Sequence, residues 1–133
     1  MKHFLIFSFL LITATSCYNH GYRRHLADLL EDSIELSDYS KVLLIPGAGC
    51  PGCISNAEQY CKSNLSDSSI LFIFTNITST KLLRYKLKLN SFVDCPNIIL
   101  DTTNHFYIQN SVDNIYPYLV EIDQGRITKI NPL

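Results

Sequence analysis

Two short apolar runs on either side of an amphipathic segment constrain this chain more than any other feature. The runs are KVLLIP, residues 41–46, and SSILFIFTN, residues 68–76. Each is too short for a helix, and such continuous apolar runs are typical of strands buried on both faces. Between them, apolar residues recur at the spacing of one helix face: Ile54, Ala57, Cys61 and Leu65. The pattern predicts a strand, helix, strand unit with parallel strands and a right-handed crossover.

The remaining segments predict the rest of the sheet and its cover. Residues 79–90 predict a helix. Its apolar stripe consists of Leu82, Leu83 and Leu87. Residues 97–101 predict a short strand, and YLVEI and RITKI predict a hairpin around a turn in which Gly125 supplies a positive φ. The expected fold class is an α/β sandwich, with a central mixed β-sheet flanked by helices and residues 41–46 as its central strand.

Length and charge limit the classes of function. The chain has 133 residues, of which 47% are hydrophobic, and this is enough for one domain with its own core. Its formal net charge is −1, so no nucleic-acid partner is expected. The basic residues near its middle fit the solvated face of the helix predicted over residues 79–90. They are Lys81, Arg84, Lys86 and Lys88.

The amino terminus predicts export. Lys2 precedes an apolar run over residues 4–12, which small residues and then Cys17 follow. The run is shorter than the roughly 20 apolar residues that span a bilayer, so we expect residues 1–16 to be a signal that is removed. A cysteine directly after small residues resembles the bacterial lipoprotein signal, although Ala14 stands where that pattern usually has Leu. The alternative is an ordinary secretory signal with an incidental cysteine.

The lipoprotein resemblance implies a place in the cell. The domain would be exported to the periplasmic side of a bacterial cell envelope and anchored to a membrane through lipid on Cys17. Residues 17–33 are then expected to form a tether and a short helix. Gly21 is the expected breaker, and the apolar residues of the short helix are Leu26, Leu29 and Leu30.

Cys50 and Cys53 form a Cys-Pro-Gly-Cys motif between the first predicted strand and its helix. The motif places Cys50 at the start of the helix, where unpaired backbone N–H groups and the helix dipole favour an anion such as a thiolate. Pro51 suits the first helical position because it has no N–H. The two-residue gap lets Cys53 close a disulfide with Cys50. We therefore predict a redox pair in which Cys50 attacks and Cys53 resolves the mixed disulfide.

Three other roles of these cysteines stay as alternatives. A structural zinc site needs four ligands, and the further candidates are Cys61, Cys95 and His105, without a second close pair. A structural disulfide across two residues would constrain little of the unfolded chain. A copper chaperone would need His105 beside the pair. Cys61 is expected to be a small buried apolar residue, or else to pair with Cys95 in an oxidising compartment, and His105 is expected to lie in a loop.

Two stretches resemble the thioredoxin-like family, in particular its membrane-tethered TlpA-type and redoxin-type branch. They are LSDYSKVLLIPGAGCPGC, residues 36–53, and IYPYLVEIDQGRITKI, residues 115–130. Two such motifs in the right order are more specific than either alone. The resemblance covers about residues 34–130, and it implies that residues 34–133 form a thioredoxin-like sandwich.

The same resemblance implies a function. A domain of this family exchanges electrons with protein thiols or disulfides, and here also with an unidentified redox partner in the envelope, without a cofactor or a metal. Pro117 would be the cis-proline that faces the active-site disulfide. The substrate groove would consist of Pro51, Gly52, Tyr116 and Pro117.

The chain also departs from the family. Gly49 stands where members often have Trp, and the sequence contains no Trp. The buried acid of the central strand is missing from residues 42–45. Water or a carboxylate such as Glu121 would then have to accept the proton in the resolving step. These departures favour, as an alternative, a non-catalytic module that binds a partner through the same groove.

Overall fold

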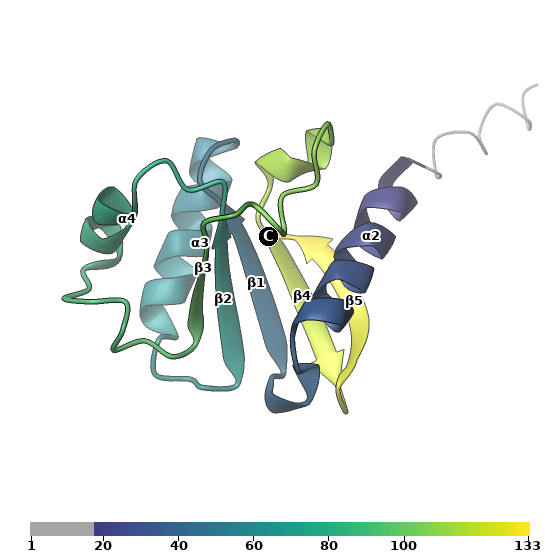
Figure 1. The fold of residues 1–133 in the computed structure, drawn as a ribbon, viewed down its shortest axis with the longest axis horizontal. Helices are drawn as coiled ribbons and strands as arrows, with labels where there is room; N and C mark the ends of the chain where they lie inside the picture. Colours follow the sequence, from purple (N-terminus) through teal and green to yellow (C-terminus); the bar gives the residue numbers. More distant parts are fainter. Residues whose placement is uncertain (1–17) are drawn as a thin grey trace, which may run out of the picture.

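The sheet of the protein has five strands in the order β3-β2-β1-β4-β5, with helices on both faces (Figure 1). The computed structural model describes residues 18–133, so the predicted signal and Cys17 lie outside the described residues. The strands are β1 (Lys41–Pro46), β2 (Ile70–Thr75), β3 (Ile98–Asp101), β4 (Tyr118–Asp123) and β5 (Arg126–Pro132). The helices are α2 (Tyr18–Ser33), α3 (Pro51–Ser63) and α4 (Thr80–Leu87), with 3₁₀ turns η1 (Leu36–Asp38) and η2 (Val112–Ile115). Within residues 18–133, no helix combines the length and the apolar character that a membrane crossing requires.

β1 is the central strand, as the sequence predicted. It pairs in parallel with β2, where Pro46 lies opposite Thr75, and antiparallel with β4, where Leu44 lies opposite Tyr118. Residues 42–45 are at most 2% exposed, and they alternate between the two faces of the sheet. Full burial of such a side chain stabilises the fold by about 1.5–3 kcal/mol. β1 therefore anchors both halves of the core, and the architecture is the expected thioredoxin-like α/β sandwich.

α3 and α4 cover one face of the sheet. Three residues of the predicted apolar stripe of α3 are confirmed, since Ile54, Ala57 and Cys61 are all buried against this face. The fourth, Leu65, follows the end of the helix at Ser63 and is only partly buried. In α4 only Leu83 and Leu87 are buried, whereas Leu82 is 51% exposed. The prediction for Leu82 was wrong because α4 has only two turns, and the pair spaced four residues apart fixes which side meets the sheet.

α2 covers the opposite face. It buries Tyr22, Leu26 and Leu30, while Leu29 is only partly buried. The expected break at Gly21 does not occur, because the helix runs without interruption from Tyr18 to Ser33. A glycine inside a helix costs about 1 kcal/mol. Burial of the three side chains outweighs that cost, so the predicted tether is helical from Tyr18 onward.

The hairpin of β4 and β5 is confirmed. Gln124 and Gly125 form its turn, and both have a positive φ, 49° and 74°.

The longest connection between two strands that contains no α-helix is the stretch of residues 102–117, which joins β3 to β4. The sequence predicted no helix or strand in this stretch. The stretch packs against the α2 face through Phe106, which is 6% exposed.

Asp101 organises the start of this connection. Its carboxylate is 5% exposed and lies at the end of β3, beside the end of β2. The carboxylate accepts hydrogen bonds from the Thr75 hydroxyl at 2.8 Å and from the backbone N–H groups of His105 and Phe106 at 2.8 and 2.9 Å. A buried carboxylate is stable in a core only with such donors. Asp101 thus holds the turn at the carboxyl end of β2 and β3.

Replacement of Asp101 by Asn is expected to lower the free energy of unfolding by about 2–3 kcal/mol. The amide would turn an NH₂ group toward groups that themselves donate. Urea unfolding followed by circular dichroism measures the change, and Asp123→Asn on the exposed hairpin turn is the control for loss of a charge. Equal stability of the two variants would contradict the role given to Asp101.

Candidate active site

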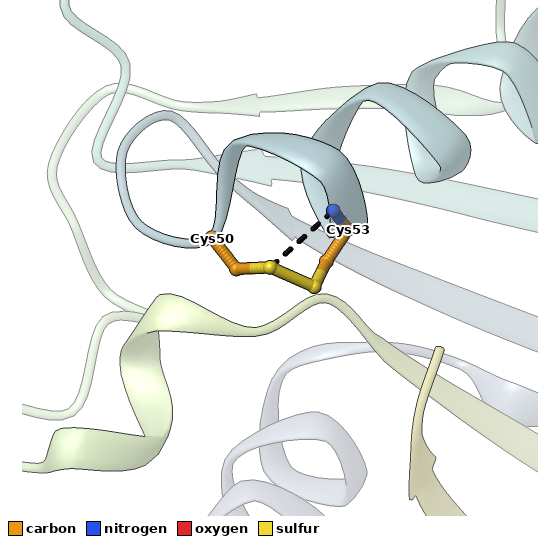
Figure 2. Close-up of a disulfide and its surroundings, with 2 residues drawn as sticks. All are labelled: Cys50 and Cys53. Atoms are coloured by element: carbon orange, nitrogen blue, oxygen red, sulfur yellow. Dashed lines mark hydrogen bonds between the residues drawn. A yellow bond between two sulfur atoms is a disulfide. The ribbon is translucent and has the colours of Figure 1, made fainter.

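Cys50 and Cys53 form a disulfide at the first turn of α3 (Figure 2). The two sulfurs are 2.04 Å apart and the two Cα atoms 5.3 Å apart. Cys50 is the N-cap of α3, and its Sγ accepts the N–H of Cys53 at 3.4 Å. Pro51 occupies the start of the helix, as predicted. Both cysteines are half-buried and thus partly accessible to solvent, and the pair fits a redox-active disulfide.

The local sequence explains why α3 begins at this place. β1 ends at Pro46, and a short loop of small residues leads to Cys50. An N-cap acceptor usually comes from Ser, Thr, Asp or Asn, and here a sulfur takes that position. The free N–H groups and the dipole at the start of a helix stabilise negative charge. A thiolate formed at Cys50 would therefore lie where the backbone favours an anion.

The segment before β4 completes the site. The N–H of Cys50 donates to the carbonyl of Ile115 at 2.9 Å. Gly49 has a φ of +146°, and a Cβ on it would lie less than 3 Å from the backbone Cα, C and O of Ile115. Gly49 therefore allows the two backbones to approach, which gives a physical reason for a glycine rather than a larger residue at this position. Sequence analysis assigned no role to Ile115.

The residues predicted for the substrate groove lie in two places. Pro51 and Gly52 are exposed on the first turn of α3. Tyr116, just before β4, is 38% exposed, while Pro117 is buried. Exposed apolar side chains from η2 join this surface at Val112 (60% exposed) and Ile115 (42% exposed), and the sequence gave no periodic signal for them.

The expectation of a cis bond before Pro117 is wrong for this structure. Residues 18–133 contain no cis peptide bond, so the Tyr116–Pro117 bond is trans. The trans form is the intrinsic preference of an X–Pro bond by about 0.5–1 kcal/mol. The expectation came from the family resemblance alone, and the residues themselves carry no signal for the cis form.

Glu121 does not lie at the active site. It is opposite Lys41, at the start of β1, whereas Cys50 follows the end of that strand. The two ends of a six-residue strand are about 16 Å apart. Glu121 instead pairs with Lys129 at 3.9 Å across the hairpin. The suggestion that Glu121 accepts the proton in the resolving step is therefore wrong.

Two tyrosines and Asp113 lie together on the side of the sheet that α2 covers. Tyr118 is opposite Leu44 on the α2 face, and its ring centroid is 4.9 Å from that of Tyr22. Burial, and then the charge of Asp113, raise the pKa of Tyr118 to about 12. Its phenol is therefore protonated and uncharged at neutral pH.

Cys61, Cys95 and His105 are the further residues that the sequence offered for a metal site or a second disulfide. Cys61 is fully buried, as predicted, and its thiol and that of Cys95 are both free in this structure. Burial, with a smaller effect of Cys95, raises the pKa of Cys61 to about 12. His105 contacts Ser33, with Nε2 2.8 Å from the hydroxyl oxygen. Among residues 21–133, whose side chains the structure describes, no three His, Cys, Asp or Glu side chains are grouped to hold a metal ion.

Fold and site together define a class: a thioredoxin-like α/β sandwich with a two-cysteine disulfide at the start of a helix. Comparisons of the chain with protein-family models, with curated proteins and with solved structures found no match. The activity is therefore argued from the geometry of the site.

Gly49→Ala is expected to lower the free energy of unfolding by about 1–3 kcal/mol, because the added Cβ would force the Ile115 backbone away and strain a positive φ. Gly52→Ala is the matched control, since no atom lies within 4 Å of the Cβ position there. A helical Gly→Ala change without steric conflict stabilises by about 0.4–1 kcal/mol. Urea unfolding of both oxidised variants measures the contrast, and equal effects would contradict the close approach.

Cys61 is expected to resist alkylation in the folded, oxidised protein at about pH 8.5, where an ordinary thiol is half ionised. Cys95, which is only half-buried, should be alkylated at least tenfold faster than Cys61. Mass spectrometry of the digested protein measures both rates. In denaturant the two rates should become equal. Fast alkylation of Cys61 in the folded protein would show that its thiol is not enclosed between α3 and the sheet.

Proposed function

We propose that the protein is a thiol-disulfide oxidoreductase that acts on protein thiols or disulfides. The observation that carries the proposal is the Cys50–Cys53 disulfide, which is partly accessible to solvent and has Cys50 as the N-cap of α3. A structural disulfide between cysteines only three positions apart stabilises the fold little, because it closes a very small loop of the unfolded chain. Its position at the start of a helix instead favours the thiolate that exchange chemistry needs.

In the reduced protein, the Cys50 thiolate attacks one sulfur of a substrate disulfide. A bond forms between Cys50 and that sulfur, and the other substrate sulfur leaves as a thiolate. Cys53 then loses its proton to solvent and attacks the Cys50 sulfur, which releases the second substrate thiolate. Two electrons pass to the substrate, and the Cys50–Cys53 disulfide is restored. The oxidised protein runs the same steps in reverse with a substrate dithiol.

Cys53 is suited to the second step by its place in the helix. Its Cα is 5.3 Å from that of Cys50, within the range that a disulfide spans. The N–H of Cys53 is directed at the Cys50 sulfur. The second attack is therefore intramolecular, and proximity of this kind accelerates a reaction strongly.

The proposed location is the bacterial cell envelope. Its support is the amino-terminal sequence, in which an apolar run and small residues precede Cys17. Lipid on Cys17 would anchor the protein to a membrane. α2, which begins at the next residue, would then connect this anchor to the rest of the domain. Its partners would be exported proteins with thiols or disulfides and an envelope protein that resets its redox state.

A non-catalytic module that binds partners is the second candidate. It is favoured by the absence of a carboxylate on the central part of β1, where residues 42–45 are all apolar. In such a module the disulfide would be permanent, and no mixed disulfide would form.

Cys53→Ser is expected to accumulate a mixed disulfide between Cys50 and substrate, because the resolving thiol is missing. Cys50→Ser is expected to form none. Both reduced variants are incubated with proteins that contain a disulfide. Where Cys50 is present, its thiolate attacks that disulfide and one substrate sulfur leaves as a thiolate. Adducts at Cys50 are separated on non-reducing gels and mapped by mass spectrometry. Insulin reduction by the unmodified protein, lost in both variants, is the second readout. The absence of adducts and of insulin reduction would favour the binding module.

A further inference from the structure

A polar cavity of about 230 Å³ lies between α2 and the segment that leads into η2. Exchange of sulfurs at Cys50 and Cys53 makes no use of it. α2 contributes Tyr22 and His25 to its lining, the N-cap of η2 contributes Ser111, and η2 itself contributes Asp113. Asp113 is the one carboxylate in this lining.

The cavity is close to the reacting sulfur. Asp113 lies two residues before Ile115, whose carbonyl binds the N–H of Cys50. This path sets an upper limit of about 14 Å between the Cα atoms of Asp113 and Cys50. Figure 2 shows α2 and the segment leading into β4 on the same side of the disulfide. An extended chain rises about 3.3 Å per residue, so a side chain two to four residues from a bound cysteine reaches the cavity.

The one carboxylate of the cavity lining has no ion-pair partner among the described side chains. The ion pairs among the described side chains of residues 21–133 are Lys86–Glu58 and Lys129–Glu121. Asp113 belongs to neither, and it is half-buried. Burial, followed by the charges of neighbouring Tyr118 and Asp113, raises the pKa of Tyr22. The phenol of Tyr22 is therefore neutral and offers a hydroxyl group without adding charge.

One cation lies near this cluster. The positive charge of Arg23 acts to lower the pKa of Tyr118, which shows that Arg23 is near Tyr118. Arg23 does not line the cavity, and its guanidinium is not within ion-pair distance of Asp113. No described cation is within ion-pair distance of the Asp113 carboxylate, which already interacts with the hydroxyl of Tyr118 and has further acceptor positions for a cation that enters from solvent.

We propose that this cavity is a specificity subsite that binds a lysine or arginine side chain of the protein substrate, two to four residues from its reacting cysteine. The proposal rests on the proposed exchange function. The ammonium or guanidinium group donates hydrogen bonds to the Asp113 carboxylate, with the hydroxyls of Ser111 and Tyr22 as further acceptors. Asp113 is then a specificity-determining residue, because it selects the substrate without touching the sulfurs.

The test uses two peptides that each contain one cysteine, with either lysine or norleucine three residues away. The peptide thiolate attacks Cys50 of the oxidised protein, forms a mixed disulfide and releases Cys53 as a thiolate. Second-order rate constants are measured by acid quench and mass spectrometry at about pH 8, where histidine is neutral. The same rates are measured for Asp113→Asn, for the control Asp123→Asn at the far end of the sheet, and for 2-mercaptoethanol in place of the peptides.

The lysine peptide is expected to react about three- to fivefold faster than the norleucine peptide, which is the range of a partly exposed ion pair. The ratio of the rate constant of the lysine peptide to that of the norleucine peptide should fall in Asp113→Asn. High salt should lower this ratio for the unmodified protein to about the same value. Asp123→Asn should keep the ratio, and 2-mercaptoethanol should react equally with all three proteins.

A ratio that is unchanged by Asp113→Asn would overturn the subsite, since lysine would then act only on the peptide's own thiol. If that variant fails to fold, a ratio that salt does not change in the unmodified protein overturns it equally. In both cases 2-mercaptoethanol still reacts, so the exchange function stands. A disulfide that no thiol opens would overturn both proposals.

Discussion

The hydrogen bond from the Cys50 amide to the Ile115 carbonyl joins the two parts of the site. It connects the first residues of α3 to the turn before β4, segments that lie far apart in sequence. Gly49 makes the approach feasible, because any side chain there would meet the Ile115 backbone. The disulfide, the exposed apolar side chains of η2 and the polar cavity are neighbours as a result of this one contact.

The sheet supplies the support for that contact. β1 and β2 are parallel, so both end at the edge from which α3 starts. In open α/β sheets this edge is where functional groups gather, because loops and helix starts meet there. Residues 42–45 fill both halves of the core, and the apolar side chains that replace a buried acid on β1 serve packing. Proton transfer is then left to solvent at the half-buried cysteines.

Much of this arrangement follows from local sequence. The periodicity of residues 41–76 was sufficient for β1, α3 and β2, and the Cys-Pro-Gly-Cys motif was sufficient to place Cys50 at the helix start. These elements depend on neighbours in sequence and on side chains buried on a regular face. Gly21 and Leu82 were misjudged because tertiary packing decides both the continuity of α2 and the orientation of α4.

The rest depends on contacts that sequence spacing does not encode. Strand register put Glu121 at the far end of β1, and only the paired strands reveal this. The connection before β4 has no hydrophobic period, so the exposure of Val112 and the cavity at Asp113 had no signal in the chain. The cis form of Pro117 was carried over from a family resemblance, and the structure has the trans form.

The central claim is that the start of α3 stabilises a thiolate on Cys50. Alkylation of the reduced protein by iodoacetamide across a pH series, with the Cys50 peptide followed by mass spectrometry, tests this claim most directly. The account predicts that the rate reaches half its plateau at least about one pH unit below the value of the same cysteine in the denatured chain, about 8.5. Identical profiles for the folded and the denatured protein would contradict it.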